Sequence, residues 1–180
     1  MLFIGWQEVT CIVAIADGDN VYMCADRGIS DDDVITSMAV PKIKQNGQYL
    51  IGYSDSPGTG QLVQYLTLPT APVKNLDKFM RTTFVSALRK ALVESGVDLK
   101  EGAHASLLIG IHGTLFAIDT SDWQVIPCEH MAIGSGSSIA MGSLYTTATW
   151  KSAEKRAYTA VSAAIELSPS CKGPIDSLYI

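Results

Sequence analysis

Two short apolar runs lie near the start of the chain. Residues 10–16 read TCIVAIA and residues 21–26 read VYMCAD, and DGDN separates them. Asp-Gly is typical of the tight turns that join antiparallel strands. The pattern predicts two paired strands, with Thr10 at their open end and Asp26 at the end of the second strand.

Further strands are expected where short apolar runs end in turn residues. Such runs lie at 48–55, 105–128, 130–138 and 173–180. SPGTG at 56–60 breaks the first, and the second reads as a hairpin turning at His112-Gly113, with one more short strand after it. The third runs into a turn of small residues. The polar segment 27–33 (RGISDDD) predicts a loop, and its three aspartates are more typical of a solvated turn than of a metal site.

Periodic apolar positions predict the helices. The strongest helix covers 75–96, where Asn75 is the expected N-cap and Gly96 the expected C-terminal glycine. Its apolar positions recur near i, i+3, i+4: Leu76, Phe79, Met80, Phe84, Leu88 and Leu92. Two more helices are expected at 138–148 and 152–168, and a short one starts at 61–66 before LPTAP interrupts it.

The order of these elements favours an α+β fold with a pair of antiparallel sheets. Strands are followed by a helix, more strands, two helices and a final strand, without the regular alternation of a doubly wound parallel sheet. The 180 residues suffice for one domain, and no linker divides them. The first nine residues, MLFIGWQEV, lack the basic start of a signal peptide and read as an N-terminal extension of a domain over 10–180.

Charge, hydropathy and cysteine content indicate which binding partners and which cellular compartment to expect. The formal charge of −5 argues against nucleic acid or an anionic membrane as the main partner. No apolar run approaches the roughly 20 residues that span a bilayer. The four cysteines form no Cys-x-x-Cys pair and have no histidine at metal-ligand spacing, so we expect reduced thiols in a cytoplasmic protein.

Thr10 is the first candidate catalytic residue along the chain. A hydroxyl is a weak nucleophile without a base beside it, and a threonine at a chain terminus can use its own α-amine, with a reference pKa near 8. The end of a strand would hold that group rigidly. The alternative for this position is an ordinary β-branched strand residue. Cys11, the next residue, is a rival nucleophile, but it would follow the terminus rather than form it.

Four more positions could support a nucleophile. Asp26 at a strand end and Lys42 in the apolar stretch AVPKI could pair, and a lysine charge lowers the proton affinity of a neighbouring group. Ser135 between two glycines could orient an amine or relay a proton. The backbone at Ser54 and Asp55, where a strand ends in small polar residues, could donate to an oxyanion. Taken singly, each of these residues is more typical of an ordinary surface or turn position.

The joint spacing of these residues resembles that of the β-type proteasome subunits, including bacterial HslV and small bacterial and phage proteasome-like proteins. Asp26 and Lys42 lie 16 and 32 residues after Thr10. The segments that carry the resemblance are TCIVAI (10–15), CAD (24–26), PKI (41–43), IGYSDSPGTGQL (51–62) and AIGSGSSIAMG (132–142). Those proteins are N-terminal nucleophile hydrolases, and the resemblance runs from Thr10 to Ile180.

The resemblance implies a four-layer αββα sandwich, two antiparallel sheets flanked by helices. It implies a threonine endopeptidase in which Thr10 is the nucleophile, Lys42 tunes it, Asp26 holds Lys42 and Ser135 assists the freed amine. Hydrolysis of a polypeptide substrate would pass through an acyl-enzyme ester, with no cofactor and no metal. A ring-like homo-oligomer and an AAA+ unfoldase are the partners it implies.

The nine-residue extension leaves a second function open. The α-amine of Thr10 exists only after the Val9–Thr10 bond is cut, and Thr10 Oγ could itself attack the Val9 carbonyl. If the extension is retained, the chain would be a non-catalytic structural or assembly protein on the same fold. The late aspartate and serine of many proteasome subunits would fall within 166–173, where the chain offers Glu166, Ser168 and Ser170.

Overall fold

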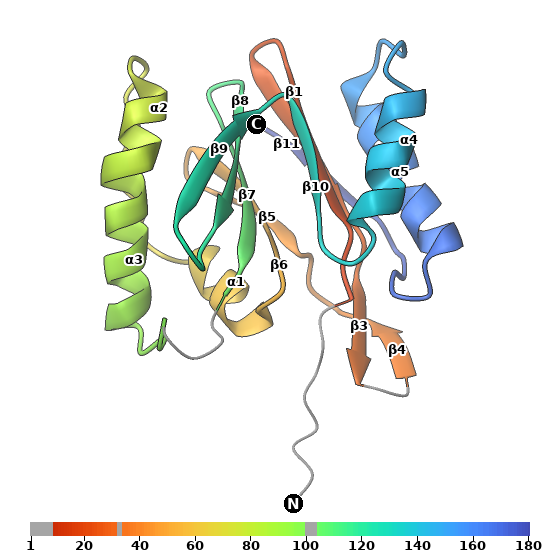
Figure 1. Ribbon diagram of the computed structural model, residues 1–180, viewed down its shortest axis with the longest axis horizontal. Coiled ribbons are helices and arrows are strands. Elements are labelled where there is room, and N and C mark those ends of the chain that lie inside the picture. The colour runs from red at the N-terminus through yellow and green to blue at the C-terminus, as the bar shows by residue number, and fades with distance from the viewer. Residues whose placement is uncertain (1–8, 32–33, 100–103) are drawn as a thin grey trace, which may run out of the picture.

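A computed structural model describes residues 9–31, 34–99 and 104–180 and consists mainly of two antiparallel sheets that face one another (Figure 1). The first sheet has the order β10-β1-β2-β11, formed by β1 (Ile12–Asp17), β2 (Asn20–Ala25), β10 (His130–Ile133) and β11 (Asp176–Tyr179). The second has the order β5-β6-β7-β8-β9, formed by β5 (Ile43–Asn46), β6 (Tyr49–Ser54), β7 (Ser106–Ile111), β8 (Thr114–Asp119) and β9 (Gln124–Cys128). The expected α+β class with paired antiparallel sheets is confirmed.

Helices cover the outer side of each sheet (Figure 1). The first sheet packs against α4 (Ser137–Thr146) and α5 (Ala153–Leu167). The second packs against α1 (Pro57–Val63), α2 (Leu76–Phe79), a π-helical turn (Met80–Phe84) and α3 (Val85–Glu94). No helix within the described ranges is both long enough and apolar enough to cross a bilayer.

Strand β1 is apolar from Ile12 to Ile15 because both of its faces are buried there. Ile12 and Ala14 point into the core between the two sheets, and Val13 and Ile15 point towards α4 and α5. This division follows from the alternation of side chains along a strand. The sheets approach closely at Gly110, where a Cβ would lie 2.8 Å from Val21 Cγ1.

The polar segment 27–33 is not the loop that its composition predicts. Residues Gly28–Asp31 form strand β3, which pairs with β4 (Val34–Ser37) in a two-stranded ribbon. Contacts distant in sequence hold this ribbon: Ser37 Oγ donates to the Gly173 carbonyl and Lys172 Nζ to the Ile35 carbonyl. Asp32 and Asp33 lie outside the described residues, as do residues 1–8 of the extension.

The helices differ from expectation at their ends. Helix α1 begins at Pro57, within the segment expected to break the chain, because proline suits the first position of a helix. The expected helix over 75–96 contains the π-helical turn, and Asn75 lies before it in a left-handed conformation without a side-chain capping bond. Gly96 has φ +84° after α3, as expected for a C-terminal glycine.

Candidate functional site

Thr10 lies two residues before the start of β1 and is fully buried. The turn after β10 encloses its backbone, and the Gly136 N–H donates to the Thr10 carbonyl at 3.0 Å. Gly134 has φ +88°, and a Cβ there would lie 2.3 Å from the same oxygen. Only glycine fits this position, so the small-residue turn that the sequence predicts is what allows Thr10 to be buried.

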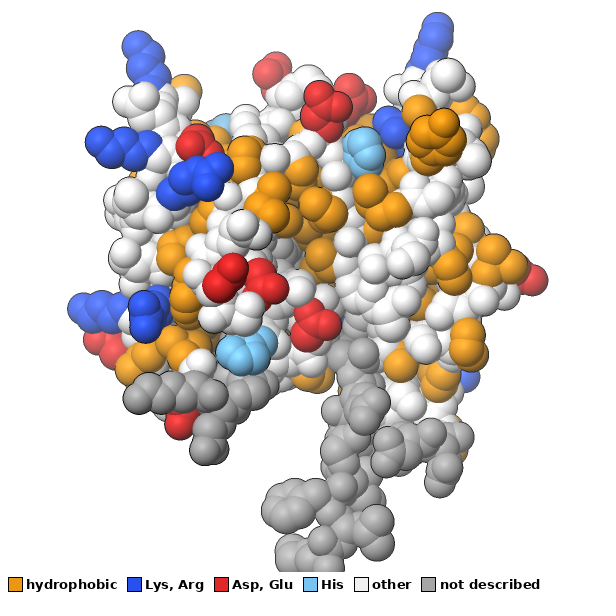
Figure 2. Space-filling model, in the orientation of Figure 1, with side chains coloured by type: hydrophobic (Ala, Val, Ile, Leu, Met, Phe, Trp, Pro, Cys, Tyr) orange, Lys and Arg blue, Asp and Glu red, His pale blue; other side chains and the backbone are white. Residues whose placement is uncertain are grey.

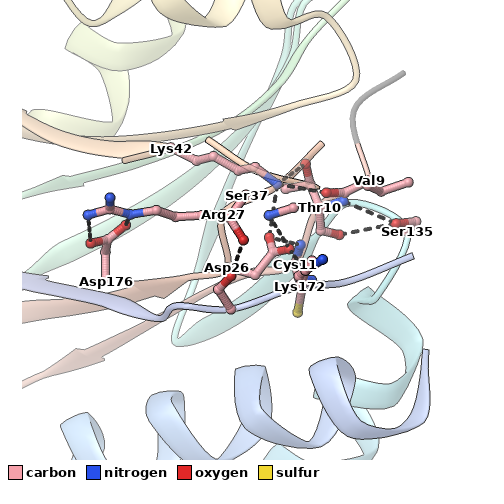
Figure 3. A network of polar contacts seen from close by, with 12 residues as sticks. Val9, Thr10, Cys11, Asp26, Arg27, Ser37, Lys42, Ser135, Lys172 and Asp176 are labelled. Carbon is pink, nitrogen blue, oxygen red and sulfur yellow. Dashed lines mark hydrogen bonds and ion pairs between the residues drawn. The ribbon is translucent and has the colours of Figure 1, made fainter. Parts of the chain in front are cut away.

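Lys42 lies directly before β5 in the opposite sheet, and its side chain is fully buried. Its Nζ donates to the Val9 carbonyl at 2.7 Å, to Thr10 Oγ1 at 2.9 Å and to Asp26 Oδ1 at 3.0 Å (Figure 3). An ammonium has three donors, and each has an oxygen acceptor here. A buried charge requires such partners, so this lysine is fixed in place by the site itself.

Asp26 follows β2 and anchors that lysine. Its Oδ1 accepts from the Cys11 N–H at 2.9 Å as well as from Lys42, and its Oδ2 accepts from the N–H groups of Gly28 and Lys172 at 2.9 and 3.0 Å. A carboxylate has about four lone-pair positions. All of them are therefore used, by donors from four separate segments of the chain.

Ser135 lies in the turn before α4, on the other side of Thr10 (Figure 3). The Thr10 N–H donates to Ser135 Oγ at 3.1 Å, and Ser135 Oγ lies 3.4 Å from the Thr10 carbonyl, to which it can donate. This N–H becomes the α-amine if the Val9–Thr10 bond is cut. The structure therefore brings four of the sequence-derived residues together: Thr10, Asp26, Lys42 and Ser135.

Ser54 and Asp55 lie at the end of β6 and are not part of this hydrogen-bonded group. Ser54 Oγ donates to Asp55 Oδ2 at 3.1 Å, and the Ser56 N–H donates to the Ser54 carbonyl. Asp55 has φ +77°, a conformation that few non-glycine residues adopt. The pairing of Ile43 with Gly52 places this end of β6 beside Lys42.

Cys11 faces away from Lys42. It follows Thr10 on the strand, so its side chain points to the other face and packs against α4 and α5. A hydrogen bond with Cys171 and burial raise the pKa of the Cys11 thiol far above its ordinary value. A protonated thiol is a poor nucleophile, which disfavours Cys11 as the rival of Thr10.

Two further residues complete the site without any signal in the sequence pattern. Gln64, almost fully buried after α1, donates to the Lys42 carbonyl at 2.9 Å. Lys172 contributes its backbone N–H to Asp26 from the segment 168–173. Glutamine is usually an exposed residue, so the pattern does not single out Gln64 as buried. A backbone donor 146 residues from its acceptor leaves no trace in the sequence.

A cavity of about 520 Å³ lies between β5 and α1, and residues on both sides of Lys42 in the sequence line it. Val40, Pro41, Lys44, Gln64 and Tyr65 are among its lining residues. Lys44 Nζ lies 4.1 Å from the centre of the exposed Tyr65 ring. Mostly apolar walls with a few polar groups are typical of sites that bind small molecules or peptide side chains.

The arrangement is suited to chemistry on an acyl group. A hydroxyl, an ammonium held by a carboxylate and a peptide carbonyl meet within hydrogen-bonding distance at the same end of the two sheets. The ammonium can stabilise negative charge on either oxygen that it contacts. Within the described ranges, no group of three or more His, Cys, Asp and Glu side chains could hold a metal ion.

Comparisons with known proteins place the fold. No protein-family model and no curated protein matches the sequence. The chain is similar to BPH of Thiobacillus denitrificans in complex with epoxomicin, with 20% identity, 95% of this chain and 98% of that chain covered, and a TM-score of 0.78. Eukaryotic HslV from Trypanosoma brucei gives 21% identity, 94% and 98% coverage and a TM-score of 0.67.

Anbu, the ancestral β-subunit from Yersinia bercovieri, is a third similar structure. It gives 16% identity, covers 95% of this chain and 81% of that chain, and has a TM-score of 0.69. Similarity over nearly the whole length, at identities this low, is evidence about architecture. The protein therefore has the fold of the HslV-like and proteasome-like β subunits.

Proposed function

We propose that the protein is a threonine peptidase whose nucleophile is Thr10 and whose activity begins with cleavage of its own Val9–Thr10 bond. One observation carries the proposal: a single buried ammonium, Lys42 Nζ, contacts the hydroxyl of Thr10, the carbonyl of Val9 and the carboxylate of Asp26. The attacking oxygen, the oxygen that would become negative and the counter-charge are then held by one group.

Self-cleavage would proceed by attack of Thr10 Oγ on the Val9 carbonyl carbon. The hydroxyl proton leaves as the C–O bond forms, and Lys42 stabilises the charge that develops on the carbonyl oxygen. The C–N bond then breaks, the Thr10 nitrogen takes up a proton, and an ester joins Val9 to Thr10. Water hydrolyses this ester, releasing residues 1–9 and freeing the amine of Thr10.

The freed amine is then the base for substrate hydrolysis. Its reference pKa is about 8, so it is partly unprotonated near neutral pH and can accept the proton of Thr10 Oγ. Ser135 Oγ, which accepts from this nitrogen at 3.1 Å, would orient it. We assign the oxyanion-binding role to the backbone amides at Ser54 and Asp55, and peptide cleavage would pass through an acyl-enzyme ester without cofactor or metal.

The proposal extends to the architecture and the assembly. The two sheets and their outer helices form a four-layer αββα sandwich over 10–180, and residues 1–9 act as a propeptide. Structural similarity to HslV-like and proteasome-like β subunits supports a closed homo-oligomeric ring that is supplied with polypeptide substrate by an AAA+ unfoldase in the cytoplasm. Heterologous contacts that close on themselves generate such rings.

Intact mass spectrometry of the purified protein tests the first step. The peptidase should lose residues 1–9, and Thr10→Ala should keep them, while Thr146→Ala, a change at an exposed threonine, should be processed like the wild type. Cleavage that persists in Thr10→Ala would assign the cut to another protease. A full-length mass in both fresh and aged wild-type samples would favour the alternative, a non-catalytic assembly protein with its extension retained.

Epoxomicin is a suitable probe of the mature site because it occupies the similar Thiobacillus structure. We expect it to inhibit hydrolysis of fluorogenic peptides by the processed protein and to leave Thr10→Ala unmodified by mass. Hydrolysis that continues unchanged in the Thr10→Ala variant would contradict the assignment of the nucleophile.

A further inference from the structure

Two of the four cysteines, Cys11 and Cys171, lie next to the threonine site on the helix-facing side of β1. Their side chains hydrogen-bond one another, and both belong to the apolar cluster between the first sheet and α4 and α5. A Cβ added at Gly136 would lie 2.6 Å from Cys171 Sγ and 2.9 Å from Cys11 Cβ. The absence of a side chain at this glycine therefore lets the two cysteines meet.

We propose that Cys11 and Cys171 form a peroxide-responsive dithiol, and that a disulfide bond between them reversibly slows the threonine site. The disulfide itself is independent of the proposed peptidase activity. Its regulatory effect rests on that proposed function.

The two thiols differ in a way that assigns their roles. Cys171 is 7% exposed, whereas Cys11 is fully buried. The hydrogen bond from Cys11 lowers the pKa of the Cys171 thiol, and the thiolate is the form that attacks an oxidant. Cys171 is therefore the thiol that meets peroxide. Its oxidation removes the thiolate whose hydrogen bond is the largest cause of the raised pKa of Cys11, so Cys11 can then act as the resolving thiol.

The oxidation takes place in two steps. The sulfur of Cys171 attacks hydrogen peroxide, the O–O bond breaks, and a sulfenic acid and one water form. The sulfur of Cys11 then displaces the sulfenic oxygen, which leaves with the Cys11 thiol proton as a second water, and the S–S bond forms. Overall the two thiols lose two electrons and two protons, and one peroxide is reduced to two waters.

The disulfide would draw the segment after α5 towards β1. An S–S bond is about 2.05 Å long, much shorter than a hydrogen-bonded contact between two thiols. Cys11 adjoins β1, which is hydrogen-bonded to β2 and β10 on both sides, whereas Cys171 lies in the connection between α5 and β11. Because β1 is held on both sides, the connection between α5 and β11 is the part that moves when the disulfide forms.

Movement at Cys171 reaches the site through the next residue. The Lys172 N–H donates to Asp26 Oδ2 at 3.0 Å, so a displaced segment lengthens this bond and leaves Asp26 with one donor fewer. Asp26 in turn holds Lys42. We expect the oxidised protein to hydrolyse peptides roughly tenfold more slowly, the effect of losing one hydrogen bond to a charged group.

The test treats the processed protein with hydrogen peroxide, removes the excess with catalase and counts free thiols by alkylation and intact mass. Peptide mapping should find Cys11 linked to Cys171, while Cys24 and Cys128 remain reduced. Hydrolysis should fall and should recover with dithiothreitol. Cys171→Ser should keep basal hydrolysis and lose the response to peroxide, whereas the matched control Cys128→Ser should keep both.

Each outcome decides one part of the proposal. If Cys24 and Cys128 oxidise as fast as the pair, or if the 11–171 linkage never forms, the dithiol is refuted. If the linkage forms and neither hydrolysis nor hydrogen exchange of the Lys172 amide changes, the regulatory effect is refuted. A reduced protein that hydrolyses nothing contradicts the proposed peptidase, and thiol counting and exchange still decide the dithiol.

Discussion

The buried pair of Asp26 and Lys42 should be strongly coupled, and a double-mutant cycle can measure this. Asp26→Asn keeps the shape of the side chain but removes the negative charge beside a fully buried ammonium. If the amide oxygen faces Lys42, the NH₂ group faces the N–H groups of Gly28 and Lys172, which then have no acceptor. Removing one partner of a buried pair costs about 3–5 kcal/mol.

Lys42→Met is the second arm of the cycle and should cost less, about 1–3 kcal/mol. Asp26 keeps its three backbone donors in this variant, while the Val9 carbonyl loses one. The double variant should then be less destabilised than the sum of the single variants, because the uncompensated charges are removed together.

The assay is urea unfolding followed by far-UV circular dichroism at one protein concentration. All four proteins should carry Thr10→Val, so that none loses residues 1–9 and the Val9 carbonyl stays in place. The exposed pair of Arg81 and Asp77 is the matched control, with a similar 2.9 Å contact. Asp77→Asn should cost below about 0.5 kcal/mol. An Asp26→Asn cost this small, or a cycle additive within about 0.5 kcal/mol, would refute the buried network.

Three further predictions follow from the same geometry. Ser135→Ala removes the acceptor of the Thr10 nitrogen; we expect kcat for peptide hydrolysis to fall at least about tenfold with little change in KM, and unchanged kinetics would contradict the orienting role. Gly134→Ala places a Cβ 2.3 Å from the Thr10 carbonyl at φ +88° and should destabilise the fold by more than about 3 kcal/mol, whereas Gly58→Ala, with nothing within 4 Å, should be neutral or stabilising in urea titrations. Burial raises the pKa of the Cys24 thiol to about 11, so the free energy of unfolding should fall as pH rises from about 8.5, where the unfolded thiol ionises, towards 11. Cys24→Ala should lose less stability than the wild type over this range, and an equal loss would contradict the shift.

Much of the fold could be predicted because local patterns and packing agree. The run TCIVAIA forms a strand buried on both faces, and the hairpin at His112-Gly113 forms with both residues at positive φ. The ribbon of β3 and β4 could not be predicted, because the segment around β3 is polar and contacts with residues 172–173 hold the ribbon. The π-helical turn at Met80–Phe84 lies within an apolar pattern that also fits an ordinary α-helix, so the pattern does not reveal it.

The candidate site was predictable only in part, because only some of its residues stand out in the sequence. Thr10, Asp26, Lys42 and Ser135 are polar residues in apolar or small-residue stretches, and such exceptions stand out in a sequence. Gln64 was missed because a glutamine in the short helical stretch QLVQYL is usually exposed. Lys172 contributes a backbone group, which almost any residue type would supply. Thiol proximity is likewise hidden, since Cys11 and Cys171 become neighbours only when α5 packs against the first sheet.

The four donors around Asp26 have a consequence for the order in which the molecule matures. Its last donor comes from Lys172, 146 residues further along the chain, and contacts between distant segments form late in folding. A ribosome-bound chain that has not yet added this segment would hold Lys42 less firmly, so the proposed self-cleavage should wait until residue 172 has been synthesised and has packed beside Asp26. The proposed cleavage is thereby delayed until the four donors that position Asp26 are all in place.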